Sequence, residues 1–180
     1  MLKVRCRFVP SKISITAFLA LTFAIVGYAQ QPTLEDPLLN HLVGHWTLTG
    51  TIRGQQTTHD VDASWVLNHQ YIQLQEVSRE KQSGTSAPQY EALVLVGLDA
   101  RRGEYVVHWM DVYGGGFSLV GYAARHPTEI PMVFKDQDGQ FLTTLTYDAA
   151  TDQWAWQMDT EHGATRQEFA RLAMRRAKPR

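Results

Sequence analysis

The stretch that decides the fold reads LVGHWTLTGTIR and covers residues 42–53. Apolar or small residues alternate in it with polar ones: Trp46, Leu48, Gly50 and Ile52 against Thr47, Thr49, Thr51 and Arg53. A period of two is typical of a β-strand with one buried and one wet face. We therefore expect a strand whose Trp46 points inward, shortly after a glycine that lets the backbone turn closely. A large aromatic residue in this position can plug the floor of a closed barrel and fix its register, and we expect this of Trp46.

Similar short segments follow along the rest of the chain. Strand-like alternation or composition is found over residues 59–65, 71–79, 90–98, 105–112, 117–125, 130–135, 141–147, 154–158 and 165–174. Residues 90–98 are almost continuously apolar, so both of their faces must be covered. Short turns rich in Gly and Asp join the segments, and no long helix separates them. The sequence predicts an all-β protein: one antiparallel up-and-down barrel of about ten strands, after a short helical turn within residues 30–41.

Several of these segments resemble the motifs of a known family. They are residues 42–46 with the Gly44-x-Trp46 opening, residues 90–99, residues 105–111 with Trp109-Met110-Asp111, and the glycine-rich turn before residues 117–121. The opening resembles that of lipocalin-type (calycin) barrels, and the wider pattern resembles a bacterial lipocalin-like family known only as domain of unknown function 1579. The resemblance implies a barrel with a ligand-holding interior and implies no activity. It also implies an Arg of the last strand packed against Trp46, for which Arg166 and Arg171 are both candidates.

The amino terminus has the features of a secretory signal peptide. Residues 1–12 carry four basic residues and no acidic one, residues 13–26 are almost uninterruptedly apolar, and small residues precede Gln30. The apolar run is shorter than the roughly 20 residues that span a bilayer, although an uncleaved anchor is the alternative. Cys6 precedes the run, so the sequence does not indicate lipoprotein acylation. We expect a secreted or periplasmic protein without stable membrane insertion after cleavage.

The expected organisation is a signal peptide over 1–29, a linker and helical turn over 30–41, the barrel over 42–174 and a basic tail over 175–180. Without residues 1–29, 13 basic and 18 acidic residues remain, a net charge of −5. This charge argues against nucleic acid as a partner. The remaining chain contains no Cys, so its stability must come from packing and not from disulfides.

Aromatic and polar residues of the expected strands are the candidates for a ligand site. We expect the interior to bind a small hydrophobic molecule, with this lining: Trp46, Trp65, Tyr90, His108, Trp109, Asp111, Tyr122, Trp154 and Trp156. Along residues 105–112, one face carries Trp109 and Asp111 while the other carries His108, and alternation leaves open which face is interior. If Trp109 faces inward, Asp111 lies near the rim as a hydrogen-bond acceptor. If His108 faces inward, its imidazole can hold a ligand or a metal.

Two other classes of function stay open. The sequence has no nucleophile elbow and no zinc-protease motif. An enzyme on this barrel would therefore be a hydrolase or isomerase that uses His108 with a carboxylate as general acid and base. A barrel filled by its own side chains would instead have a structural or interaction role. Self-association into a homodimer through strand edges or aromatic residues is a further option.

We expect no cofactor and no metal. Haem is the alternative, because some ten-stranded barrels with a Gly-x-Trp opening bind it, and His162 is the ligand that such a resemblance nominates. Those barrels have more glycine just after the Trp, whereas here Gly50 and Gly54 are widely spaced. His41 and His45 have a helical metal spacing, but His45 starts a strand, so the two need not share a face.

Overall fold

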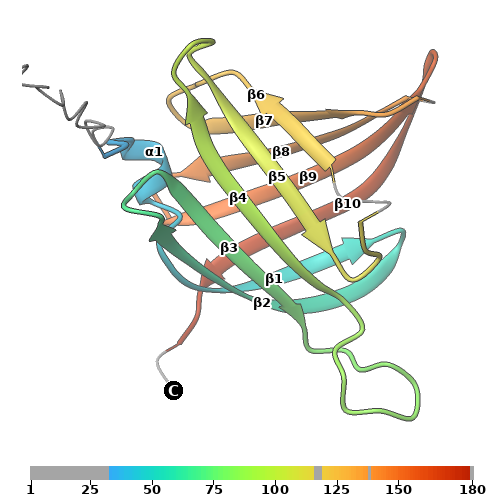
Figure 1. The fold of residues 1–180 in the computed structure, drawn as a ribbon. Helices are drawn as coiled ribbons and strands as arrows, with labels where there is room; N and C mark the ends of the chain where they lie inside the picture. Colours follow the sequence, from blue (N-terminus) through green and yellow to red (C-terminus); the bar gives the residue numbers. More distant parts are fainter. Residues whose placement is uncertain (1–32, 116–118, 138, 179–180) are drawn as a thin grey trace, which may run out of the picture. The chain divides into compact units, whose positions relative to one another are not determined.

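The computed structural model describes residues 33–115, 119–137 and 139–178, and the expected signal peptide lies outside them. Over these residues the chain forms one helix and ten strands. They are α1 (Pro37–Asn40), β1 (Gly44–Ile52), β2 (Gln55–Val66), β3 (Tyr71–Ser78), β4 (Glu91–Asp99), β5 (Glu104–Asp111), β6 (Leu119–Ala123), β7 (Glu129–Lys135), β8 (Gln140–Asp148), β9 (Gln153–His162) and β10 (Thr165–Arg176). The strands close into one antiparallel barrel (Figure 1). The predicted all-β, ten-stranded up-and-down barrel is confirmed.

The barrel closes because the last strand pairs with the first. Each strand is hydrogen-bonded to the next along the chain, and β10 pairs with β1 from Arg176 opposite Trp46 to Ala170 opposite Ile52. At Gly50 the two strands approach so closely that a Cβ atom would lie 2.1 Å from the carbonyl oxygen of Arg171. Only glycine fits there. Closure also places β4 between β3 and β5, so β4 forms no edge, whereas its outer face is only half-buried and not covered as the sequence led us to expect.

Several strands are longer than the sequence pattern indicated. The turn between β1 and β2 contains only Arg53 and Gly54, whose φ angles of 49° and 77° suit a two-residue hairpin turn. β2 therefore begins at Gln55, four residues before the expected start. β9 likewise continues to His162 and does not stop at residue 158. These extensions carry additional inward-facing residues to one end of the barrel, where they line a cavity.

The other end of the barrel is covered by α1. Asp36 caps this helix, since its Oδ1 accepts hydrogen bonds from the backbone N–H groups of Leu38 and Leu39 at 3.0 and 3.1 Å. Its Oδ2 accepts from the Tyr105 hydroxyl at 2.7 Å and from Arg125 Nη2 at 2.9 Å. Burial, followed by the interactions with Asp36, raises the pKa of Tyr105 above its ordinary value. In the part of the chain that the structure describes, no helix is long and apolar enough to cross a bilayer.

The arginine that packs against Trp46 is Arg176, and the expectation of Arg166 or Arg171 is wrong. Trp46 is buried and donates from Nε1 to the Leu42 carbonyl oxygen at 2.7 Å. The guanidinium carbon of Arg176 lies 3.8 Å from the centre of the indole ring. Antiparallel pairing with β1 places the residue opposite Trp46 at the very end of β10. β10 thus continues two residues beyond the expected barrel boundary, and Arg175 and Arg176 belong to the strand.

Arg166 and Arg171 both pair with the buried Asp159. The Nη2 atoms of the two arginines lie 2.5 and 2.9 Å from its carboxylate oxygens. Burial acts to raise the pKa of Asp159, but hydrogen bonds from Gln157, Arg166 and Arg171 outweigh it and lower this pKa to about 2. The carboxylate is therefore ionised over the whole physiological pH range.

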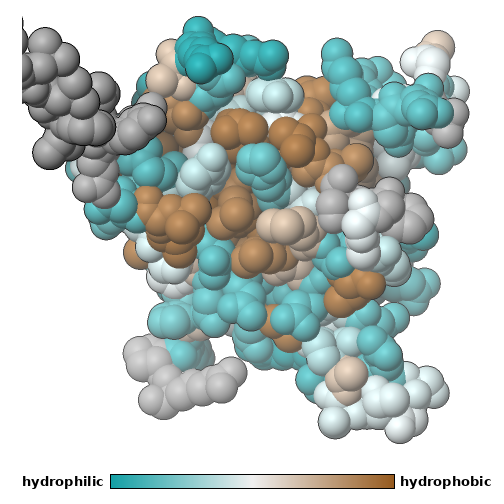
Figure 2. Space-filling view, in the orientation of Figure 1, coloured by the Kyte–Doolittle hydropathy of each residue, from teal (hydrophilic) through white to brown (hydrophobic). Residues whose placement is uncertain are grey.

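The outer face of β4, β5 and β6 is also apolar. Leu93 and Leu95 are half-buried on the outside of β4. Met110, Val120 and Tyr122 are exposed at 37%, 48% and 38% beside them. Figure 2 shows this face as a brown area among hydrophilic surroundings. Because both faces of β4 carry apolar side chains, its sequence reads as a continuous apolar run.

We expect Arg176→Ala to lower the free energy of unfolding by about 1–2 kcal/mol, because it removes the contact with Trp46 and the hydrogen bonds that Arg176 donates to the Val43 and His41 carbonyls. Arg175→Ala is the matched control, since Arg175 donates to Gln153 at an exposed position of the same strand. It should change stability by less than about 0.5 kcal/mol. Urea unfolding followed by Trp fluorescence measures both, and equal effects would contradict the role given to Arg176.

Asp159→Asn should destabilise the protein in a pH-dependent way. The pKa of Asp159 is lower in the folded than in the unfolded chain, so its ion pairs stabilise the fold fully above the unfolded pKa of about 4. That contribution is lost as the pH falls toward about 2. The difference in melting temperature between the two proteins should therefore shrink over this window. Asp62→Asn, at an exposed carboxylate, is the control; a pH-independent effect of Asp159→Asn would refute this account.

Candidate functional site

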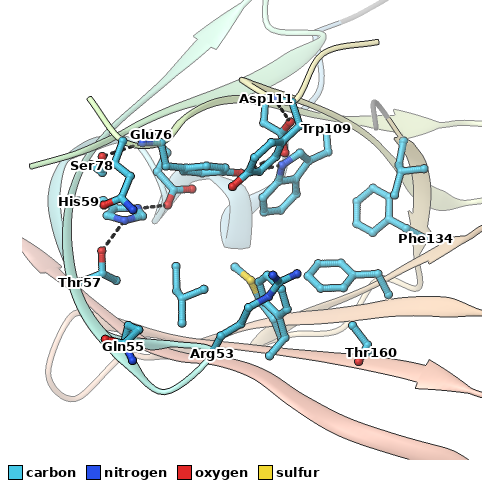
Figure 3. A pocket seen from close by; sticks show the side chains of 18 of the residues that line it. Arg53, Gln55, Thr57, His59, Glu76, Ser78, Trp109, Asp111, Phe134 and Thr160 are labelled. Carbon is cyan, nitrogen blue, oxygen red and sulfur yellow. Dashed lines mark hydrogen bonds and ion pairs between the residues drawn. The ribbon is translucent and has the colours of Figure 1, made fainter. Parts of the chain in front are cut away.

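A cavity of about 590 Å³ lies inside the barrel at the end away from α1 (Figure 3). Its lining comes from the last residues of β1, β3, β5, β7 and β9 and from the first half of β2, β6, β8 and β10. Residues of the connecting segments complete it: Arg53, Glu80, Gln89, Tyr90, Tyr113 and Asp136. The half of the barrel next to α1 is filled instead by large side chains, among them Trp46, Trp154 and Trp156. The barrel thus has one packed half and one hollow half.

One wall of the cavity is aromatic. Trp109 lies at its centre, with Phe134 edge-on at 6.1 Å and the core residue Trp156 at 5.7 Å between ring centres. The Trp109 Nε1 group donates to the Tyr90 hydroxyl at 3.2 Å, which fixes the indole ring. Met158 adds a flexible apolar surface to the same lining. Such a wall suits a flat, apolar molecule.

Next to this aromatic wall, the lining holds a buried pair of ionisable side chains. His59 on β2 and Glu76 on β3 are each 2% exposed. Nδ1 of His59 is hydrogen-bonded to Oε1 of Glu76, and its Nε2 lies 2.7 Å from Oγ1 of Thr57. The pair arises because Val61 is opposite Glu76 in the register of β2 and β3, so that His59 and Glu76 are diagonal neighbours on the inner face.

The protons of this group can be assigned from its hydrogen bonds. The carboxylate of Glu80 accepts from the Thr58 backbone at 2.9 Å and from the Thr57 hydroxyl at 3.0 Å. Burial acts to raise the pKa of Glu80, but hydrogen bonds from its own backbone, from Thr58 and from Thr57 lower it below its ordinary value. The single hydroxyl proton of Thr57 therefore points to Glu80, and His59 must donate to Thr57 from Nε2. One proton then remains for the contact between His59 Nδ1 and Glu76.

This assignment limits the chemistry that the group can perform. Thr57, His59 and Glu76 are the residue types of a catalytic triad, with a hydroxyl nucleophile, an imidazole base and a carboxylate that orients the base. A nucleophilic hydroxyl must donate to the imidazole, however, and here the imidazole donates to the hydroxyl. The group therefore cannot activate Thr57, and it can hold or exchange a proton between His59 and Glu76.

A second polar group lies at the rim. The Tyr90 hydroxyl donates to Asp111 Oδ2 at 3.4 Å. Burial, followed by the negative charge of Glu76, raises the pKa of Tyr90 above its ordinary value, so this hydroxyl stays protonated. Arg53 extends over the ring of Phe169, 4.9 Å from its centre, and is exposed. Four acidic side chains line the cavity together with Arg53 and His162; they are Glu76, Glu80, Asp111 and Asp136.

The structure brings three of the predicted site residues together. Tyr90, Trp109 and Asp111 line the cavity and are linked by hydrogen bonds. The open question about residues 105–112 is thereby settled, because Tyr105 and Val107 are buried on the inner face and Trp109 follows them. His108 consequently lies on the outer face, where its ring is 6.3 Å from that of Tyr71.

The other predicted residues lie elsewhere. Trp46, Trp154 and Trp156 belong to the packed core. Trp65 donates to Asn40 at 2.8 Å and stacks on His69, and Tyr122 is on the exposed outer face. None of these five residues lines the cavity.

The histidines considered for haem or metal binding have three different surroundings. His41 stacks on Tyr147, and the exposed His45 pairs with Asp62. His162 lines the cavity. Across residues 33–115, 119–137 and 139–178, no three His, Cys, Asp or Glu side chains are grouped closely enough to hold a metal ion.

Sequence reasoning missed His59 and Glu76. His59 alternates with Val61 and Ala63 and so belongs to the inner face of its strand. Glu76 alternates in the same way with the buried Ile72 and Leu74. These patterns are visible in the sequence, but the partnership of the two residues depends on strand register, which no sequence motif indicates. Comparison with models of known protein families and with curated proteins found no match.

Removing one member of the buried pair should cost more than removing both. Glu76→Leu leaves Nδ1 of His59 without its partner and should lower the free energy of unfolding by about 2–4 kcal/mol. The double change His59→Phe with Glu76→Leu replaces both polar groups by apolar ones and should restore most of that loss. Urea unfolding of both variants and of His59→Phe alone completes the cycle. A double variant as unstable as Glu76→Leu would mean that the pair is needed for folding.

Proposed function

We propose that this protein is an exported lipocalin-like barrel that binds a small, mainly apolar molecule in the hollow half of its interior. The observation that carries the proposal is the cavity of about 590 Å³ with Trp109 and Phe134 in its wall. Binding sites for small molecules have volumes of roughly 300–1,000 Å³, with mostly apolar walls and a few polar anchors. Tyr90 and Asp111 are such anchors, together with the pair of His59 and Glu76.

The contrast between the two halves of the barrel favours binding over a purely structural role. Indole rings fill the half next to α1, and the same packing could have filled the other half. Apolar residues of similar size would stabilise the fold at least as much as a buried His–Glu pair, because burying ionisable groups costs desolvation energy. The retention of this pair beside a cavity supports a role toward a ligand.

An enzyme is the second candidate, with His59 and Glu76 as the groups that exchange a proton. His108, the base expected from the sequence, cannot serve inside the barrel because it lies on the outer face. General acid–base catalysis needs a proton-exchanging group within reach of the substrate, and His59 and Glu76 border the cavity. Binding remains the better-supported function, since it requires only the cavity and its lining.

Export and family membership complete the proposal. The basic, apolar and small-residue sequence of residues 1–29 supports removal of a signal peptide and a secreted or periplasmic location. The ten-stranded barrel and the inward-facing Trp46 fit the lipocalin-like family of domain of unknown function 1579.

Filling the cavity should abolish binding of an apolar probe. Thr160 lines the cavity, and Thr146 is exposed on the neighbouring strand β8. Thr160→Phe should weaken the binding of N-phenyl-1-naphthylamine about tenfold or more by steric overlap, and Thr146→Phe should leave it unchanged. Probe fluorescence, measured on protein purified after expression of the full chain, gives both affinities. No binding by the unchanged protein, or equal loss in both variants, would refute the site.

Amino-terminal sequencing of the exported protein should find Gln30 as the first residue. A product that begins at Met1 would refute cleavage of the signal peptide.

A further inference from the structure

One oxygen of the buried carboxylate of Glu76 has no partner within the protein. The side chain is 3% exposed. Its Oε1 is hydrogen-bonded to His59, but Oε2 has no hydrogen-bond partner among the described residues. Glu76 lines the cavity, and Figure 3 shows its carboxyl group turned toward the interior. Oε2 itself has almost no accessible surface, so a ligand reaches it where a neighbouring side chain of the lining shifts. A buried carboxylate oxygen without a donor has lost its hydration without compensation, so a group that donates to it would be bound favourably.

The orphan oxygen is an acceptor in either protonation state of the pair. His59 donates from Nε2 to Thr57, as the proton of Thr57 points to Glu80. If the remaining proton is on His59 Nδ1, Glu76 is a carboxylate and Oε2 carries negative charge. If that proton is on Oε1 of Glu76, then Oε2 is a carbonyl oxygen. In both states a ligand must offer an N–H or O–H group, and a ligand carboxylate or carbonyl finds no donor there.

The charges around the cavity favour a cation over a neutral donor. Glu76, Glu80 and Asp111 all line it. The arginine of the lining, Arg53, is exposed at the mouth, where solvent screens its charge. Because His59 keeps its proton on Nε2, the pair of His59 and Glu76 has no net charge in either state, and the excess of negative charge in the lining comes from Glu80 and Asp111. When the shared proton is on His59, a positive group at Oε2 lies nearer to the negative carboxylate of Glu76 than to the imidazolium, and in this buried place it is attracted more strongly than it is repelled.

Aromatic rings flank the position that such a group would occupy. The Tyr90 ring lies 5.8 Å from the imidazole of His59, and Trp109 is hydrogen-bonded to Tyr90. Aromatic faces attract cations, and the indole of Trp109 also offers a flat apolar surface for the rest of the molecule. The polar head and the apolar body of a ligand can therefore be bound at adjacent places of one cavity.

We propose that the ligand of this protein is a small amine: a ring-containing apolar body with one protonated amino group that donates a hydrogen bond to Oε2 of Glu76. The inference rests on the proposed function, because it specifies the ligand of the same cavity. It excludes fatty acids and other carboxylates as preferred ligands.

Four naphthalenes with the same ring and different heads test the proposal on the full chain. They are 1-naphthylmethylamine, 1-naphthylmethanol, 1-methylnaphthalene and 1-naphthoate, each competed against N-phenyl-1-naphthylamine. The amine should bind about tenfold or more tightly than the methyl compound, the alcohol should lie between them, and the carboxylate should bind most weakly. Glu76→Gln retains an acceptor oxygen and loses the charge, so the amine should lose its advantage over the alcohol. Glu91→Gln, at an exposed position of the adjacent strand β4, should leave the order unchanged.

The outcomes separate this inference from the proposed function. Equal binding of all four compounds, or preferred binding of the carboxylate, would overturn the inference and leave the apolar cavity as a binding site. No binding of any of them, and none of the fluorescent probe, would overturn both. The order of affinities in the unchanged protein decides the matter even if Glu76→Gln does not fold. If that variant folds and keeps the full amine preference, Glu76 is not the partner and the inference fails.

Discussion

The pairing of β1 with β10 is the interaction on which the rest of this structure depends. It turns a meander of ten strands into a closed ring and removes the free edges at which sheets otherwise aggregate. The cation–π contact of Arg176 with Trp46 lies at one end of this seam, and the close approach at Gly50 lies in its middle. The register between β1 and β10 also fixes how the remaining strands are staggered. It therefore decides which of their side chains lie at the floor of the barrel and which lie at its mouth.

Most strands contribute to both halves of the interior through the same alternation. Along β2, Ala63 and Val61 face the packed half, and His59 and Thr57 face the cavity. A short stretch of chain thus supplies hydrophobic burial at one end and polar groups at the other. Packing in the apolar half offsets the loss of stability caused by burying the ionisable pair. The polar half gives a ligand space and hydrogen-bonding groups, which a filled barrel would lack.

The fold could be predicted from the sequence because strand alternation is local, whereas the site depends on relations between strands. Residues 105–112 were ambiguous for a physical reason: the outer face of β5 is itself apolar, so neither face could be recognised as exposed. Arg176 was missed because the end of the last strand is set by its pairing with β1. That pairing extends the strand to the residue opposite Trp46, beyond the end that the sequence pattern indicated. The pair of His59 and Glu76 needs the register of two strands, and no residue pattern along one strand encodes it.

The seam between β1 and β10 also has a consequence for how the chain is made. Trp46 and its partner Arg176 are separated by almost the entire barrel sequence, so the ring cannot close until the last strand has left the ribosome. Until then β1 and β9 each have one unpaired edge, and the apolar interior is open to solvent. Long-range pairing of this kind slows folding and exposes intermediates to aggregation. A translation stop or proteolytic cut a few residues before Arg176 would therefore endanger the whole domain, although it removes no residue of the cavity.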